Sequence, residues 1–121
     1  FDLNNLKKAN DTLGHSVGDQ LILNFARLLR NSVPSNDFVG RYGGDEFIAV
    51  IYNSTKDEVT DMLRQLDKEI SKFNELGKAF KISYAHGCAF SSDYENCTLR
   101  TLFDKADKNM YNNKQAEKAG R

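Results

Sequence analysis

The stretch Arg41-Tyr42-Gly43-Gly44-Asp45-Glu46-Phe47 places two glycines and two neighbouring carboxylates between two short runs of β-forming residues. These runs cover residues 38–42 and 47–52, and a glycine-rich segment between such runs predicts a β-hairpin with a tight turn. Glycine reaches positive φ without steric cost, so we expect positive φ in this turn. The acidic pair Asp45 and Glu46 is therefore expected at the tip of the hairpin.

Amphipathic helices are predicted on both sides of the hairpin. Apolar residues recur at helical spacing over residues 19–30. After the hairpin, Thr55 and Glu58 form the capping-box pattern that starts a second helix, and Thr98 can cap a third. The apolar positions of the three helices are Leu21, Ile22, Phe25, Leu28 and Leu29; Val59, Met62, Leu63, Leu66, Ile70 and Phe73; and Leu99, Leu102, Phe103, Ala106 and Met110.

Two further strands complete the predicted sheet. Residues 80–88 alternate apolar and more polar side chains, with Cys88 expected as a small core residue, and residues 1–3 resemble the end of a strand that enters a polar loop. This order of elements predicts an α+β fold, in which helices cover an antiparallel sheet of the ferredoxin-like, palm type. Because only residues 1–3 represent the first strand, we expect an N-terminally incomplete domain that lacks most of it.

The composition indicates one domain and excludes several classes of function. The 121 residues are 40% hydrophobic, which is enough for one core, and 17 Lys and Arg balance 17 Asp and Glu. The chain therefore lacks the basic field expected of a nucleic-acid partner or of a polymerase-like palm. No apolar run approaches the roughly 20 residues of a membrane span. We expect a cytoplasmic domain without membrane contact, whose parent protein can still be membrane-anchored.

Three carboxylates are candidates for a shared metal site. Asp2 ends the first predicted strand, and in a ferredoxin-like sheet that end can lie beside the hairpin tip with Asp45 and Glu46. Clustered carboxylates repel one another, so such a site needs a cation, and oxygen ligands select Mg²⁺ or Mn²⁺. These ions commonly bind substrate phosphates as well, which predicts phosphoryl or nucleotidyl transfer. Taken alone, the acidic stretch can equally be a solvated turn.

Several motifs together resemble the GGDEF domain family from residue 1 to about residue 118. They are Asp2-Leu3-Asn4-Asn5-Leu6-Lys7-Lys8-Ala9-Asn10-Asp11, Gly14-His15, Gly18-Asp19, the stretch 41–47, and Ala106-Asp107-Lys108-Asn109-Met110-Tyr111 with Lys114. The resemblance implies a GGDEF domain over residues 1–121 that lacks the usual N-terminal helix. It also implies a diguanylate cyclase, a bacterial signal-transduction nucleotidyltransferase that joins two GTP molecules into cyclic di-GMP and releases two pyrophosphates.

The same resemblance implies the catalytic and metal-binding residues. Asp2, the Leu3 backbone carbonyl, Asp45 and Glu46 would ligate Mg²⁺ or Mn²⁺. Glu46 would also lie near the attacking ribose 3′-hydroxyl, whose pKa has to be lowered for attack. Asp45 and Glu46 are thus the implied catalytic residues.

The residues implied in substrate binding are Asn10, Asp19, Gly43, Gly44, Lys114 and Lys118. Asn10 and Asp19 would read the guanine edge, since a carboxylate accepts from the N1–H and N2 amino groups of guanine. The glycines would let the backbone approach the phosphates, and Lys114 would contact a phosphate. Lys118 stands where the family usually has an arginine, so the charge is kept without the bidentate fork.

The resemblance also implies how the domain assembles and how it is controlled. Each domain would bind one GTP, so the product requires a homodimer in which two domains face each other across a two-fold axis. Sensory or phosphodiesterase domains are expected in the parent protein. The family's inhibitory product site is an Arg-x-x-Asp, and here residues 34–37 keep Asp37 but begin with Pro34, so no product inhibition is expected. The alternative function is a catalytically silent GTP-binding or dimerisation module.

Overall fold

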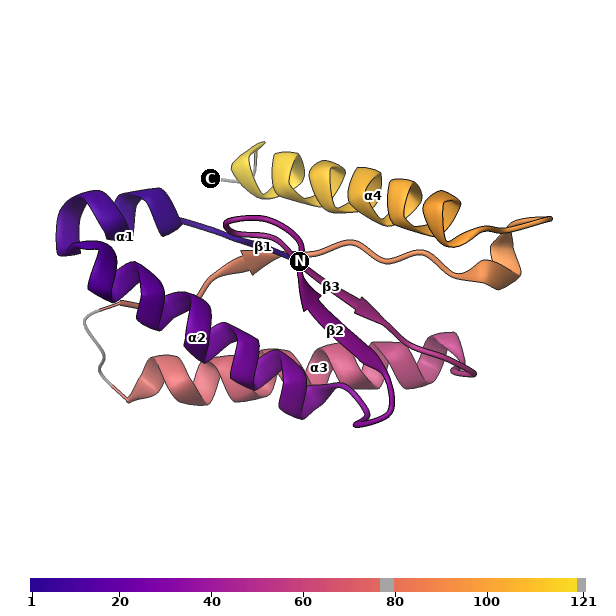
Figure 1. The fold of residues 1–121 in the computed structure, drawn as a ribbon, viewed down its shortest axis with the longest axis horizontal. Coiled ribbons are helices and arrows are strands. Elements are labelled where there is room, and N and C mark those ends of the chain that lie inside the picture. Colours follow the sequence, from indigo (N-terminus) through magenta and orange to yellow (C-terminus); the bar gives the residue numbers. More distant parts are fainter. Residues whose placement is uncertain (77–79, 120–121) are drawn as a thin grey trace. The chain divides into compact units, whose positions relative to one another are not determined.

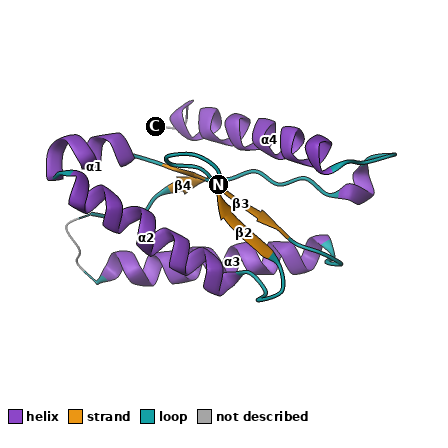
Figure 2. Ribbon diagram, viewed as in Figure 1, coloured by secondary structure: helices purple, strands orange, loops and turns teal. Residues whose placement is uncertain are grey.

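The computed structural model describes residues 1–76 and 80–119, without the side chains of Lys118 and Ala119. The fold is α+β, as the sequence predicted, and Figures 1 and 2 show its elements. In chain order they are β1 (Asp2–Leu3), α1 (Leu6–Leu13), α2 (His15–Ser32), β2 (Phe38–Arg41), β3 (Phe47–Val50), α3 (Lys56–Glu75), β4 (Tyr84–Ala85), the 3-10 turn η1 (Ser91–Asp93) and α4 (Leu99–Ala119). The described strands pair as β1 with β4 and as β2 with β3.

The chain forms two compact units. The larger unit is Leu3–Ser83, and the smaller unit joins Phe1–Asp2 to Tyr84–Arg121. The larger unit contains α1, α2, α3 and the β2–β3 hairpin, whereas the smaller unit contains β4, η1 and α4.

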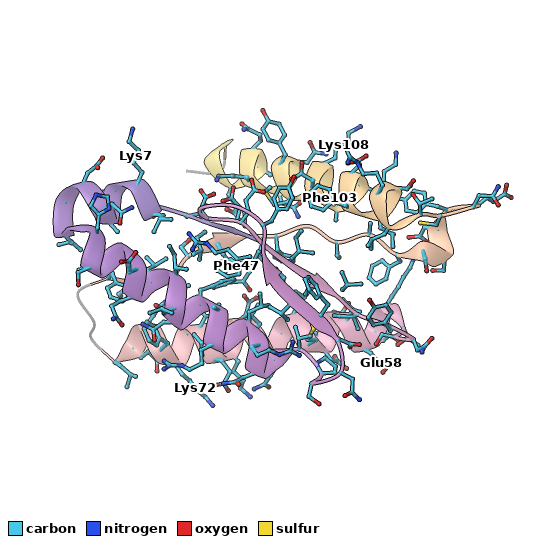
Figure 3. The ribbon with its side chains drawn as sticks, viewed as in Figure 1. Lys7, Phe47, Glu58, Lys72, Phe103 and Lys108 are labelled. Atoms are coloured by element: carbon cyan, nitrogen blue, oxygen red, sulfur yellow. The ribbon has the colours of Figure 1, made fainter. Side chains whose placement is uncertain are left out.

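The core of the larger unit lies where α2, α3 and the hairpin meet. The hairpin is antiparallel, with Phe38 opposite Val50 and Arg41 opposite Phe47. Phe47, labelled in Figure 3, is buried and packs against Phe25 of α2, with ring centroids 5.1 Å apart. The helices contribute the buried side chains Leu21, Phe25 and Leu29 from α2 and Leu66, Ile70 and Phe73 from α3. These residues belong to the apolar faces predicted from sequence, and burying each large one stabilises the fold by about 1.5–3 kcal/mol.

Helix α1 was not predicted, because its apolar residues Leu6, Ala9 and Leu13 have helical spacing but form only a narrow stripe in a polar segment. Ala9 is its one buried residue, so packing against α2 rather than a wide apolar stripe holds it in place. The helix ends at Gly14, whose φ of 93° only glycine adopts readily, and whose N–H donates to the Asn10 carbonyl at 3.0 Å. Gly14 is also the N-cap of α2, so the two helices follow each other directly.

The hairpin turn differs from the expected tight turn. Gly14 is the one described glycine with positive φ, so the expectation of positive φ at Gly43 and Gly44 was wrong. The physical reason is a longer connection between β2 and β3, in which the N–H groups of Tyr42 and Gly43 both donate to the Glu46 carbonyl, at 2.8 and 3.4 Å. A loop of this length turns without left-handed residues. The acidic pair lies in the loop between the two strands, as predicted.

The strand predicted over residues 80–88 forms only at Tyr84–Ala85. In the larger unit, the Asn74 side chain accepts from the Ile82 N–H at 2.8 Å and donates to the Ile82 carbonyl at 2.9 Å, replacing a neighbouring strand. In the smaller unit, residues 86–88 leave the strand to follow α4. Cys88 is exposed there, so its expected core position was wrong.

Two helix starts agree with the sequence. The Thr55 hydroxyl accepts from the Glu58 N–H at 3.1 Å, and the Glu58 carboxylate accepts from the Thr55 N–H at 3.3 Å, which is the predicted capping box. Thr98 caps α4 by accepting from the Thr101 N–H at 3.1 Å. Within residues 1–76 and 80–119, none of the helices combines the length and apolar character needed to cross a bilayer.

Candidate functional site

Arg41 organises the acidic loop of the hairpin. Its Nε donates to the Gly43 carbonyl at 3.0 Å and its Nη2 to the Gly44 carbonyl at 2.7 Å. The side chain thereby binds two successive backbone carbonyls that have left the strand ladder, and it fixes the path of the chain into Asp45. Sequence reasoning assigned no role to Arg41. The available signal was an arginine two residues before a pair of glycines, since its fork of donors suits unpaired carbonyls.

Gly43 and Gly44 are not required by the packing of the protein. A β-carbon built on either glycine would meet no described atom within 4 Å, and neither residue has positive φ. The usual internal reasons for glycine, a left-handed backbone or a tight neighbour, are therefore absent in the described structure. The remaining reason for glycine at these positions is access to the loop backbone, because a residue without a side chain leaves the backbone open to a bound molecule.

Within the larger unit, a backbone hydrogen bond joins the N-terminal segment to the acidic loop. The Leu3 N–H donates to the Asp45 carbonyl at 2.8 Å, and the Asn4 N–H donates to the Ser83 carbonyl at 2.8 Å. A second bond joins the Asn4 side chain to the Ser83 hydroxyl at 3.0 Å. Leu3 is 1% exposed, so the backbone that would offer its carbonyl is held in the interior. Asp45 and Glu46 are each half-buried.

In the smaller unit, Asp2 is a buried carboxylate with one paired and one unpaired oxygen. The residue is 7% exposed, and its Oδ2 accepts from the Lys114 Nζ at 2.8 Å. Its Oδ1 is buried and has no hydrogen-bond partner among the described residues. An unpaired buried carboxylate oxygen is costly and unusual. Sequence reasoning gave Lys114 a phosphate and did not anticipate its pairing with Asp2, since the two residues are 112 positions apart.

The donor chemistry at Asp2 fits a hard divalent cation, because an anionic oxygen without a protein partner is the ligand that such ions prefer. The expected gathering of three carboxylates is not found. The described residues contain no group of three or more His, Cys, Asp or Glu side chains placed to hold a metal ion. Asp2 belongs to the smaller unit, and Asp45 and Glu46 to the larger one. The metal set Asp2, Leu3, Asp45 and Glu46 stays a prediction.

The two residues predicted to bind the guanine edge lie on the consecutive helices α1 and α2. Asn10 is half-buried near the end of α1, and its amide lies against Gly18 of α2. Asp19 is the next residue and is exposed. The structure therefore brings the Asn10 amide next to the residue that precedes Asp19, although eight residues separate positions 10 and 19.

Helix α4 is held in register by two asparagines that sequence reasoning overlooked. Asn109 donates to the Cys88 carbonyl at 2.9 Å, and Asn113 donates to the His86 carbonyl at 2.8 Å. Between these carbonyls, Gly87 lies against the helix backbone, where an added β-carbon would come within 2.7 Å of the Asn109 carbonyl carbon. This contact fixes the position of Lys114, one residue after Asn113. Lys118 lies in the same helix, and its side chain is outside the described part of the chain.

Residues 34–37, where the family's product site would lie, form hydrogen bonds with neighbouring residues of the same chain. The Asp37 carboxylate accepts from the Tyr52 N–H at 3.3 Å. Arg30 donates to the carbonyls of Asp37 and Pro34, at 2.8 and 2.5 Å, and so closes the loop after α2. Position 34 itself supplies no guanidinium.

The α+β fold and the Gly-Gly-Asp-Glu loop of the β2–β3 hairpin together agree with the family that the sequence resembles. The chain belongs to the GGDEF domain family, because the family model "Diguanylate cyclase, GGDEF domain" matches residues 1–120. The resemblance drawn from the sequence motifs is thereby confirmed.

Named relatives and a solved structure agree with this membership. The chain is 40% identical over 98% of its length to the signaling protein YkoW of Bacillus subtilis, and 32% identical over its full length to the diguanylate cyclase DgcS of Shewanella oneidensis. The crystal structure of a sensory box/GGDEF family protein from Caulobacter crescentus superposes with a TM-score of 0.75 at 30% identity, covering 95% of this chain and 75% of that one.

The match covers only part of each curated relative. The chain spans 15% of the Bacillus protein and 38% of the Shewanella protein. In the Caulobacter protein, a GGDEF domain is named together with a sensory box.

Proposed function

We propose that this domain is a diguanylate cyclase, which condenses two GTP molecules into cyclic di-GMP and releases two pyrophosphates. The observation that carries the proposal is the buried Asp2 carboxylate, whose Oδ1 has no partner while Oδ2 is paired with Lys114. Such a group suits a site that receives a cation and an anionic substrate together. The intact Asp45 and Glu46 in the family's signature loop support the same function.

Metal binding, proton transfer and phosphate binding would each fall to particular residues of this chain. Asp2, the Leu3 carbonyl, Asp45 and Glu46 would hold Mg²⁺ or Mn²⁺, which supplies charge stabilisation at the phosphates and lowers the pKa of a bound hydroxyl. Glu46 would accept the proton of the ribose 3′-hydroxyl. The open backbone at Gly43 and Gly44 would admit the phosphates. Lys114 and Lys118 would contribute positive charge to phosphate binding.

Substrate choice and assembly follow from the same proposal. Asn10 and Asp19 would select guanine over adenine, because an acceptor at guanine N1–H and N2 has no matching donors on adenine. Each of two 3′-hydroxyls must attack the other nucleotide, so the active species would be a homodimer with two-fold symmetry. In the parent protein, a sensory or phosphodiesterase domain would control how often two domains meet.

The silent alternative, a GTP-binding or dimerisation module, differs only in the chemical step. The deciding experiment follows cyclic di-GMP and pyrophosphate in the complete protein with GTP and Mg²⁺, comparing the natural chain with Glu46→Gln. We expect product from the natural chain and none from the variant, which should still bind GTP. GTP binding without any product in the natural chain would establish the silent module instead.

Calorimetry tests the metal separately. GTP binding should weaken strongly in chelator, and the dependence on Mg²⁺ should be lost in Asp2→Ala. Equal affinity with and without the ion would remove the metal from the proposal.

A further inference from the structure

A glycine in α2 leaves space that a neighbouring side chain fills. Gly18 is buried, and a β-carbon built on it would lie 2.7 Å from Cγ and 3.3 Å from Nδ2 of Asn10, and closer still to Oδ1. Real β-carbons essentially never come within 3.0 Å of other atoms, as this one would with Cγ and Oδ1 of Asn10. The Asn10 amide therefore occupies the space that any side chain at position 18 would need.

The conformation of helix α2 does not require glycine at position 18. Gly18 has no positive φ, and glycine is among the poorest helix formers whereas alanine is the best. The atoms that exclude alanine all belong to the far end of one flexible side chain, Asn10, and not to backbone. The helix would thus accept alanine at position 18, and the cost would fall on the placement of the Asn10 amide.

The backbone around the helix junction sets these two residues face to face. The Gly14 N–H donates to the Asn10 carbonyl at 3.0 Å, and the Gly14 carbonyl accepts from the Gly18 N–H at 3.3 Å. The Asn10 side chain itself is held by no hydrogen bond from a described residue. Its amide is therefore placed by contact with Gly18, and its donors and acceptor stay available for another molecule.

We infer that Gly18 is a positioning residue for purine recognition: the absence of its side chain seats the Asn10 amide beside Asp19, so that both polar groups face one base. The inference rests on the proposed function, because it assigns Gly18 to the guanine site proposed there. Gly18 acts through Asn10 and need not touch the nucleotide itself.

The experiment is a double-mutant cycle on the complete protein with Gly18→Ala, Asn10→Ala and both changes together. GTP and ATP affinities are measured by calorimetry and folding by thermal unfolding, with Ser16→Ala, an exposed residue of the same helix, as the matched control. We expect each single change to weaken GTP binding roughly ten- to hundredfold while ATP binding changes little, because a lost polar contact in a binding site has this size. The double variant should bind GTP no more weakly than Asn10→Ala, and Gly18→Ala should unfold at or above the natural temperature.

Each other outcome has a distinct meaning. If Asn10→Ala weakens GTP binding but Gly18→Ala does not, the inference is wrong and the guanine site stands. Additive losses in the double variant, or an unfolded Gly18→Ala that Asn10→Ala fails to rescue, also overturn the inference. If Asn10→Ala leaves GTP affinity unchanged, the guanine role of Asn10 in the proposed function fails, and the inference fails with it.

Discussion

The Lys114 ammonium donates to Asp2 Oδ2 at 2.8 Å, and this bond joins α4 to β1 within the smaller unit. The two side chains retain 27% and 10% of their exposure, so the pair is largely removed from water. A charge in such a place is stable mainly because its partner is there.

Replacing Lys114 with Met should therefore destabilise the protein by about 2–3 kcal/mol, below the full cost of a broken buried pair because Lys114 keeps some exposure. Urea unfolding measures the change. The control is Lys108→Met on the same helix, where Figure 3 shows Lys108 directed away from the side that carries Phe103, and it should stay within about 0.5 kcal/mol. A second change, Asp2→Asn, should recover part of the loss, and equal losses in Lys114→Met and Lys108→Met would contradict the account.

Asp19→Ala should remove the preference for GTP over ATP. If Asp19 accepts from the guanine N1 and N2 groups, its loss removes the discrimination while phosphate contacts remain. Competition between the two nucleotides for the protein measures the ratio directly. The neighbouring exposed Gln20→Ala is the control. An Asp19→Ala variant that still excludes ATP would show that another group selects the base.

Turnover per domain should rise with protein concentration until dimers saturate. Each product molecule needs two bound GTP molecules held in line, and bringing them together is a second-order step unless the domains are already paired. Pyrophosphate release across a dilution series provides the measurement. Turnover that is independent of concentration would mean either a permanent dimer or another mechanism, and sedimentation of the same samples separates these two cases.

If the domain is the proposed cyclase, cyclic di-GMP should not inhibit it through the loop at residues 34–37. Asp37 accepts from the Tyr52 N–H, and the nearby Arg30 is engaged with two backbone carbonyls, so the described loop offers no free guanidinium at position 34. Initial rates with added product should match those without it. Calorimetry with Pro34→Arg tests the converse, since this change restores the arginine that the product site requires.

Cys88 should alkylate slowly at pH 8. Although the residue as a whole is exposed, burial of the thiol raises its pKa, so less thiolate is present than in an unfolded chain. Because the folded pKa is the higher one, this group's contribution to stability is fully present below the unfolded pKa, about 8.5, and is lost as the pH rises from there through the folded pKa. Iodoacetamide labelling of Cys97→Ser follows Cys88 alone, and Cys88→Ser should flatten the decline of stability above about pH 8.5. Labelling as fast as in urea would refute the prediction.

The helices and the hairpin could be predicted because their signals are local. The capping box at Thr55 and the apolar face through Leu21, Phe25 and Leu29 lie within single elements and agree with the structure. Helix α1 was missed because its apolar stripe of Leu6, Ala9 and Leu13 is narrow and only Ala9 is buried, so packing against α2 contributes much of its stability. The strand predicted over residues 80–88 was too long, because the Asn74 side chain forms hydrogen bonds with both backbone groups of Ile82, which a neighbouring strand would otherwise pair.

The candidate site shows the same limit. Its residues could be named from motifs, but their partners could not. The Asp2–Lys114 pair and the contact of Asn10 with Gly18 depend on how distant segments pack. Positive φ at Gly43 and Gly44 was inferred from composition, and the longer loop made it unnecessary.

The separation of 112 positions between Asp2 and Lys114 has a consequence for biosynthesis. Translation delivers Asp2 near the start of this segment and Lys114 near its end, and closing so long a loop requires the intervening chain to be organised first. During most of synthesis the Asp2 carboxylate is thus exposed to water and has not yet met Lys114. A polypeptide that stalls before α4 is finished carries the whole acidic loop yet lacks the Lys114 ammonium, so the Asp2 carboxylate of such a truncated product has no partner to stabilise it away from water.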